Sequence, residues 1–207
     1  MTTSALFWDR MANRYAKSPI SNKEAYERKL EITRKYFTPQ SQVLEFGCGT
    51  GSTAILHSPF VKHIHAIDVS GNMLTIAKSK VEAENIENIT FEKTSIEEFD
   101  GAENSYDVIL GLSILHLLED KRAAMNKIHK MLKPDGVFVS STYCGRGNNA
   151  LVRVLLSFGS AVHLLPKVKF FSPESLQMSV GDAGFRLDHV WQPEGSDALF
   201  VVARKPQ

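Results

Sequence analysis

The feature that most constrains the fold is a regular alternation, between residues 42 and 142, of short apolar runs with segments of helical periodicity. The apolar runs have the length of strands, whereas apolar residues in the intervening segments recur every three or four positions. Strands that alternate with helices of this length predict βαβ units and a parallel sheet covered on both faces. We expect strands at residues 42–46, 63–68, 89–93, 106–110 and 137–142.

The end of the chain follows a different pattern. Ser172 and Pro173 are a suitable N-cap and first helical residue for a helix that runs to about Ala183. Strands at 185–191 and 199–203 follow, and the loop between them is too short for a parallel crossover, so they should be antiparallel. The predicted fold class is therefore α/β: a Rossmann-like, doubly wound, seven-stranded sheet, mostly parallel with an antiparallel last strand.

At 207 residues the chain fits one domain, and it contains no repeat or low-complexity tract. We divide this domain into an N-terminal helical lid (1–38, with helices at 6–17 and 23–37), a cofactor-binding half (39–142), a substrate-side insertion (143–171), and a C-terminal helix with a strand pair (172–207).

Charge and cysteine content exclude several classes of protein. The 24 basic residues nearly balance the 23 acidic ones and form no basic stripe, so we do not expect a nucleic-acid partner. Cys48 and Cys144 show neither metal-ligand spacing nor a disulfide framework. With no secretory signal or apolar span of about 20 residues, we expect a cytoplasmic protein without a transmembrane segment. Peripheral membrane contact and the oligomeric state stay open.

The segment VLEFGCGTG (43–51) predicts what the domain binds. In open parallel sheets, ligands bind beyond the carboxyl ends of the strands, and glycine allows close approach to the backbone. A dinucleotide fingerprint would need glycine where Ser52 stands, and Glu45 would repel a phosphate. Asp68, at the end of the second strand, suits the two hydroxyls of a ribose. A ribose and a cationic group without phosphate describe S-adenosylmethionine.

The chain resembles, over nearly its whole length, the class I S-adenosylmethionine-dependent methyltransferases of the small-molecule type. VLEFGCGTG is similar to their first motif and the residues 67–70 to their second, and the segments 94–97, 106–116 and 132–137 follow in the expected order. The resemblance implies cofactor contacts at Tyr15, Glu45, Phe46, Gly47, Cys48, Gly49, Asp68, Val69, Met73, Ser95, Ile96, Gly111 and Leu112.

The resemblance also implies individual roles. Glu45 would bind the methionyl ammonium, and Asp68 the ribose. Met73 would pack on adenine or belong to the core. Ser95 stands where many members have an aspartate, so a contact with the adenine amine would come from the backbone. Cys48 would contribute only its backbone and its small size.

Two residues are catalytic candidates. His116, just past the fourth expected strand, is a candidate general base, or it packs or caps there. Tyr15 resembles the lid tyrosine of related small-molecule methyltransferases, or it packs with Trp8 and Met11 as a helix stripe. The sequence shows no acidic cluster that would bind a catalytic metal, so none is expected.

The acceptor is indicated only by the segment 145–171. Four apolar residues share one helical face there: Leu151, Val154, Leu155 and Phe158. If this face covers the substrate side of the domain, it favours methyl transfer to a small, apolar or lipid-like acceptor. The segment could instead form a core helix, a membrane-surface helix or a subunit contact, and these alternatives stay open. The acceptor atom and the use of a general base also stay open. The alternatives to a methyltransferase are a non-catalytic S-adenosylmethionine-binding protein and an NAD-dependent oxidoreductase.

Overall fold

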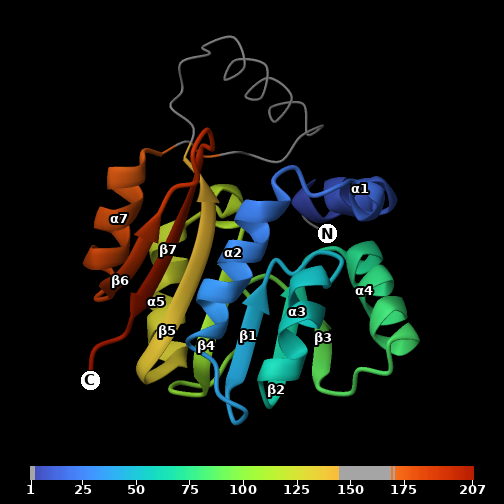
Figure 1. Ribbon diagram of the computed structural model, residues 1–207, viewed down its shortest axis with the longest axis horizontal. Coiled ribbons are helices and arrows are strands. Elements are labelled where there is room, and N and C mark those ends of the chain that lie inside the picture. Colours follow the sequence, from blue (N-terminus) through green and yellow to red (C-terminus); the bar gives the residue numbers. More distant parts are fainter. Residues whose placement is uncertain (1–2, 145–168, 170) are drawn as a thin grey trace.

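The computed structural model describes residues 3–144, 169 and 171–207. In this part of the chain, seven strands form one sheet in the order β3-β2-β1-β4-β5-β7-β6, with helices on both faces (Figure 1). The strands are β1 (Gln42–Phe46), β2 (His63–Asp68), β3 (Ile89–Lys93), β4 (Tyr106–Leu112), β5 (Leu132–Tyr143), β6 (Arg186–Trp191) and β7 (Ala198–Arg204). The helices are α1 (Thr3–Lys17), α2 (Lys23–Arg34), α3 (Ser52–His57), α4 (Gly71–Ala83), α5 (Lys121–Met131), α7 (Pro173–Asp182) and the 3-10 helices η1 (Ser58–Phe60) and η2 (Leu115–Leu117).

The direction of each strand confirms the predicted fold class. Strands β3, β2, β1, β4 and β5 are parallel to one another. Strand β7 is antiparallel to both β5 and β6. The strand order reverses between β1 and β4, and in such sheets the crevice at this switch point is where ligands bind.

Two strands are longer than expected. Strand β4 runs to Leu112 and not to residue 110, because its last two residues pair with Ser140 and Ser141 of β5. Strand β5 begins at Leu132 and not at residue 137, because Leu132 already pairs with Tyr106. The register of this pairing shifts between Tyr106 and Val108, so the residues 133–136 form an irregularity within the strand.

The helix α2 is shorter than expected and ends at Arg34, not at residue 37. The N–H groups of Tyr36 and Phe37 donate to the carbonyls of Thr33 and Arg34, three residues back, so the chain tightens before β1. Conversely, α1 begins earlier than expected, at Thr3.

Two apolar clusters flank the sheet, because successive strand residues point to opposite faces. One face, with Phe46, Ile109 and Phe138, packs against α5 and α7. The other, with Val43 and Leu110, packs against α2, α3 and α4. None of the helices described here has the length and apolar character needed to cross a bilayer. The apolar segment 150–165 lies outside the described residues.

Candidate cofactor site

The loop that follows β1 depends on its glycines. Gly47, Gly49 and Gly51 all have positive φ, at 66°, 54° and 72°, a region that favours glycine. A Cβ on Gly47 would also lie 2.7 Å from Cγ1 of Ile114. The N–H of Cys48 donates to the carbonyl of Ile67, 3.1 Å away, which holds the loop against β2. The loop therefore presents bare backbone at the carboxyl ends of the central strands.

Lys80, on α4, fixes the far side of this loop. Its Nζ donates to the carbonyl of Thr50 at 3.0 Å, the hydroxyl of Thr50 at 3.1 Å and the hydroxyl of Ser52 at 3.0 Å. This role of Lys80 was not predicted from the sequence. The available signal was that Lys80 shares a helix face with two residues of the expected core, Met73 and Ala77.

Asp68 lies beneath the loop, as expected. It is buried, and its two carboxylate oxygens accept hydrogen bonds from the N–H groups of Gly49 and Ser70, each at 2.8 Å. Burial raises the pKa of Asp68, while these two hydrogen bonds act in the opposite direction. Each oxygen keeps lone-pair capacity, so the carboxylate can still accept from two ligand hydroxyls.

Glu45 is the most unusual group of the site. Its side chain is 3% exposed, and its Oε2 has no hydrogen-bond partner among the described residues. Burial, together with the nearby Asp68, raises the pKa of Glu45 to about 8. A buried carboxyl without a donor is costly unless a ligand supplies one. A ligand ammonium next to a ribose would satisfy both carboxyls, so these residues fit S-adenosylmethionine.

Tyr15 extends from α1 toward the loop. Its Cε1 lies 3.8 Å from the point that a Cβ on Gly49 would occupy, and Trp8 packs edge-on against its ring at 6.2 Å. Burial raises the pKa of Tyr15, and the charges of Asp68 and Glu45 add to this effect. Tyr15 thus both packs along α1 and reaches the site. The connection between α1 and α4 is made by Asp9, which the sequence analysis did not single out.

Three predicted contact residues have their side chains in the core. Phe46, Met73 and Ile96 are 1%, 2% and 3% exposed. The hydroxyl of Ser95 accepts from the N–H of Glu98 at 3.1 Å and is thus used within its own turn. At these positions a ligand would meet chiefly backbone. Cys48 is also buried, which raises the pKa of its thiol and keeps it neutral.

The remaining predicted contacts lie at the ends of two strands. Val69 follows β2 and Leu112 ends β4, and both are half-buried. Gly111 is buried against the ring of Phe46.

His116 lies in η2, directly beyond β4. Its ring is half-buried, and Nδ1 has no partner among the described residues. Burial lowers the pKa of His116, so the imidazole is neutral at pH 7 with a nitrogen able to take a proton. The ring lies 6.4 Å from that of Tyr143, and the His116 carbonyl accepts from the N–H of Lys169 at 2.8 Å.

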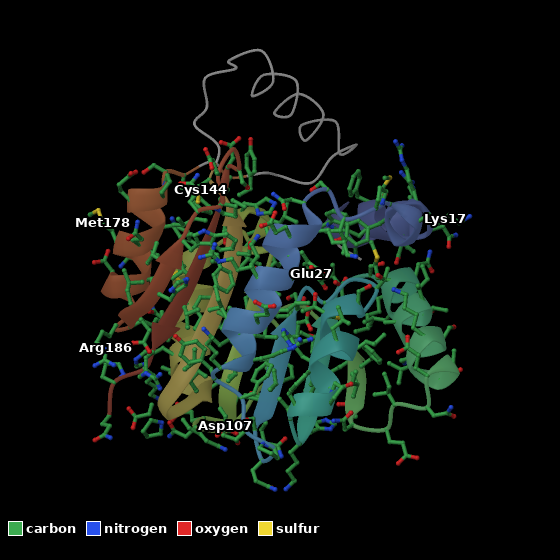
Figure 2. The ribbon with its side chains drawn as sticks, in the orientation of Figure 1. Lys17, Glu27, Asp107, Cys144, Met178 and Arg186 are labelled. Carbon is green, nitrogen blue, oxygen red and sulfur yellow. The ribbon has the colours of Figure 1, made fainter. Side chains whose placement is uncertain are left out.

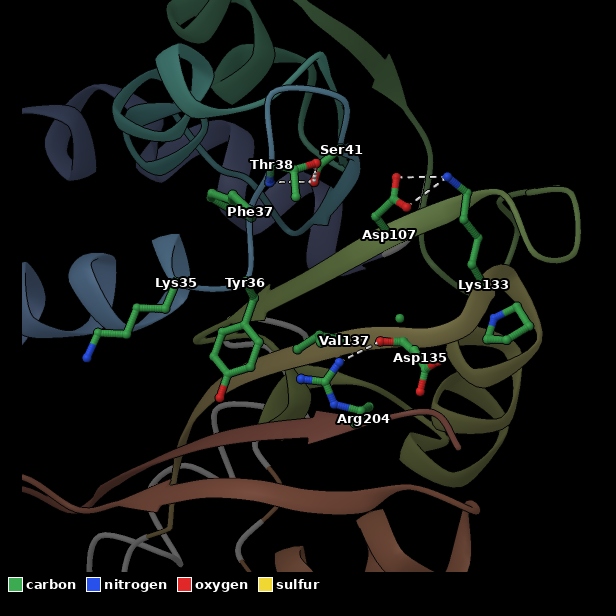
Figure 3. A pocket seen from close by; sticks show the side chains of 12 residues that line it. Lys35, Tyr36, Phe37, Thr38, Ser41, Asp107, Lys133, Asp135, Val137 and Arg204 are labelled. Carbon is green, nitrogen blue, oxygen red and sulfur yellow. Dashed lines mark hydrogen bonds and ion pairs between the residues drawn. The ribbon is translucent and has the colours of Figure 1, made fainter. Parts of the chain in front are cut away.

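A separate polar cavity of about 380 Å³ lies at the opposite end of the sheet (Figure 3). Figure 2 shows Asp107, one of its lining residues, far from Cys144 at the carboxyl end of β5. Asp107 accepts from Lys133 at 2.8 Å and from the Gln42 N–H at 2.7 Å. Arg204 donates to Asp188 at 2.9 Å. These charged groups already bind one another, so we do not place the functional site here.

The sheet order and the two carboxyls at the glycine loop define a Rossmann-like domain that binds a cationic nucleoside. A family model described as "Methyltransferase domain" matches residues 37–169. The chain belongs to this family, the class I S-adenosylmethionine-dependent methyltransferases. S-adenosylmethionine is the family's cofactor, and the residues described above fit it.

Two curated relatives and one solved structure illustrate the similarity. The phosphoethanolamine N-methyltransferase of Plasmodium falciparum is 33% identical over 56% of this chain and 46% of its own length. The malonyl-[acyl-carrier protein] O-methyltransferase of Bacillus anthracis is 32% identical over 68% of this chain and 49% of its own length. The chain thus spans about half the length of these relatives. The structure of Haemonchus contortus phosphoethanolamine N-methyltransferase 2 has a TM-score of 0.74 at 18% identity, covering 88% of this chain and 53% of its own.

Proposed function

We propose that this chain transfers the methyl group of S-adenosylmethionine to a small-molecule acceptor in a single in-line displacement. The observation that carries the proposal is the buried Glu45 beside Asp68 at the glycine loop, whose Oε2 has no hydrogen-bond partner among the described residues. When bound, the cofactor supplies a methyl group activated by a sulfonium. Membership of the methyltransferase family supports the same reaction.

The residues of the chain act mainly by positioning. Glu45 would hold the ammonium and Asp68 the ribose, while Gly47 and Gly49 let the backbone approach. Holding reactants in line is worth roughly 7–11 kcal/mol of a barrier. Tyr15 on α1 would cover the site and exclude water, which strengthens these electrostatic contacts.

His116 is the proposed general base for acceptors that must lose a proton. Its Nδ1 is buried without a partner among the described residues, and its lowered pKa favours the neutral form that can accept a proton. An acceptor that is already a thiolate or a neutral amine would not need this residue.

The acceptor is proposed to be small and apolar or lipid-like. Support comes from the apolar segment 150–165 of the sequence. The names of two relatives indicate small or carrier-bound acceptors of different chemistry, phosphoethanolamine and malonyl-[acyl-carrier protein]. We also propose a cytoplasmic location, which the two free cysteines, Cys48 and Cys144, support.

The test is incubation of the purified protein with methyl-labelled S-adenosylmethionine and panels of thiols, phenols, quinones, amines and fatty acids. We expect label transfer to one class of acceptor. Asp68→Ala should weaken S-adenosylhomocysteine binding at least about tenfold by calorimetry. Cofactor binding without label transfer to any panel or to a crude lysate would favour a non-catalytic binding protein. Unchanged affinity in Asp68→Ala would contradict the ribose assignment.

A further inference from the structure

Lys29 lies on the inner face of α2 and has no counter-ion among the described residues. Its side chain is half-buried, and its Nζ donates to the hydroxyl of Ser141 on β5 at 2.9 Å. No carboxylate pairs with Lys29 among the described residues, and the residues outside that description contain neither Asp nor Glu. Burial lowers the pKa of Lys29, and no acidic group opposes this effect. A buried ammonium with one neutral partner is costly, which makes its position informative.

The partner of Lys29 lies beside the candidate site. Ser141 pairs with Leu112, the last residue of β4 and a predicted cofactor contact. The carbonyl of Ser141 accepts from the N–H of Ser113 at 2.6 Å, so the backbone that leaves β4 is anchored to the same residue. Lys29 therefore reaches the carboxyl end of β4 from the α2 side.

The same face of α2 borders the site one turn earlier. Tyr26 lies three residues before Lys29, and residues three apart share a helix face. The Tyr26 hydroxyl is 3.0 Å from the hydroxyl of Thr53, just after the glycine loop. Burial raises the pKa of Tyr26, and the charge of Glu45 adds to this effect, whereas the hydrogen bond with Thr53 opposes it. The inner face of α2 thus runs from the cofactor carboxyls to Lys29.

The residues that pair with Ser141 across the sheet are apolar. Its two neighbours across the sheet are Leu112 on β4 and Phe200 on β7, and both belong to the apolar cluster under α2. The exposed lysine of the same helix is arranged differently: Lys23 pairs with Glu27 at 3.6 Å on the solvent side, where Figure 2 labels Glu27. A cation that has no counter-ion among the described residues and lies against apolar neighbours suits an apolar ligand that carries one anionic group.

We propose that Lys29 binds an anionic oxygen group, a carboxylate or a phosphate, on the apolar methyl acceptor, and thereby selects anionic over neutral acceptors. The inference rests on the proposed function, since it assigns the acceptor side of that site. The ammonium of Lys29 is held in place before the ligand arrives. Pairing it with an anionic group therefore costs the side chain little conformational freedom. Lys29 is thus a specificity residue and takes no part in methyl transfer itself.

The test uses the full chain saturated with S-adenosylhomocysteine and titrated, by calorimetry, with three probes of equal chain length: octanoate, octyl phosphate and neutral octanol. We expect one of the two anions to bind at least about tenfold more tightly than octanol, a preference typical of one charged contact. Which anion binds more tightly distinguishes a carboxylate acceptor from a phosphate acceptor. Lys29→Met should lose the preference while binding octanol as before.

Two variants make the result specific to this side chain. Lys23→Met removes an exposed lysine of the same helix and should behave like the wild type, and Lys29→Arg should retain most of the preference for the anion. The inference would be overturned if Lys29→Met bound the anions as tightly as the wild type. It would also be overturned if the wild type preferred neither anion to octanol. If the wild type did not bind S-adenosylhomocysteine, this result would instead contradict the proposed function.

Discussion

The carboxylate of Asp9 on α1 accepts a hydrogen bond from the hydroxyl of Ser70, the N-cap of α4, at 2.7 Å. The same oxygen accepts from the N–H of Asn72 at 3.0 Å, and the amide of Asn72 donates to the Asp9 carbonyl at 3.0 Å. These hydrogen bonds lower the pKa of Asp9, so the group stays ionised at neutral pH. A negative charge is favourable at this end of a helix. The pair therefore holds α1, and with it Tyr15, over the glycine loop.

Asp9→Ala should loosen the lid and weaken S-adenosylhomocysteine binding about fivefold, because ordering α1 would then cost part of the binding free energy. Trp8 provides a direct readout, since the only other tryptophan is Trp191. In a Trp191→Phe background, the Trp8 emission should shift to longer wavelength in Asp9→Ala. Lys17→Ala, at the exposed end of α1 (Figure 2), is the matched control and should change neither signal. An unchanged Trp8 spectrum in Asp9→Ala would contradict this role.

The raised pKa of Glu45 predicts that cofactor binding depends on pH. Its carboxyl, with a pKa of about 8, is mostly protonated in the ligand-free site at pH 7, whereas an ammonium requires the carboxylate. Cofactor binding should therefore release nearly one proton, and the affinity should rise with pH between 6 and 7.5, by at most about tenfold per pH unit. Calorimetry in buffers of different ionisation enthalpy measures the released protons directly.

The control for this linkage is Glu45→Gln, which keeps the shape of the side chain but cannot ionise. It should bind S-adenosylhomocysteine about tenfold more weakly and with no proton release. Proton release of equal size in the wild type and in Glu45→Gln would assign the linkage to another group.

The sequence was informative where function depends on the end of a strand. Glu45 and Asp68 could be placed in one site because parallel strands of a doubly wound sheet end at the same edge. The parallel direction of the first five strands followed from the alternation of strands and helices. The limits of β4 and β5 could not be predicted. Gly111 and Leu112 stay in the sheet because their backbone pairs with β5, and such pairing leaves no pattern of side chains in the sequence.

The residues that the sequence analysis missed share a different property. Asp9, Lys29 and Lys80 each bind partners on another element, and their effect depends on how helices pack on the sheet. Their local sequence shows only ordinary polar residues of amphipathic helices. Side-chain contacts between distant segments leave no periodicity in a single sequence, so only the tertiary structure brings these residues to the site.

Gly111 should tolerate no side chain. A Cβ there would lie 2.3 Å from Cζ of Phe46, within the packed core. Overpacking of this kind costs about 1–3 kcal/mol of the free energy of unfolding, and we expect Gly111→Ala to show such a loss in urea titrations. Gly181 is the matched control: it lies in α7 with nothing within 4 Å of an added Cβ, so Gly181→Ala should be neutral or stabilising by up to about 1 kcal/mol.

The source of the Gly111 effect can be checked with a double-mutant cycle. Phe46→Leu shortens the side chain that the new methyl group would meet, so Gly111→Ala should cost less in that background than in the wild type, by about 1 kcal/mol. Equal costs in both backgrounds would mean that the Phe46 ring is not the obstacle.

His57 should make the fold sensitive to acid. Its ring is fully buried and packs edge-on against Phe37 at 4.9 Å, and neither nitrogen has a partner among the described residues. Burial, with a smaller contribution from Arg34, lowers the pKa of His57 to about 3. The unfolded chain takes up a proton below pH of about 6.5. The stability that neutral His57 contributes is thus complete above that pH and is lost as the pH falls toward 3.

Urea unfolding at pH 7.5 and pH 5.5 tests this. Over this interval the wild type should lose about 1.4 kcal/mol more free energy of unfolding than His57→Leu, since the unfolded chain gains its proton within this range and the folded chain does not. The difference in free energy of unfolding between the two proteins at pH 7.5 measures the effect of the changed packing. The carboxyl groups titrate alike in both proteins, so their contribution cancels in the comparison. If both proteins lost the same amount between the two pH values, His57 would have to be protonated, or solvated, in the folded state as well.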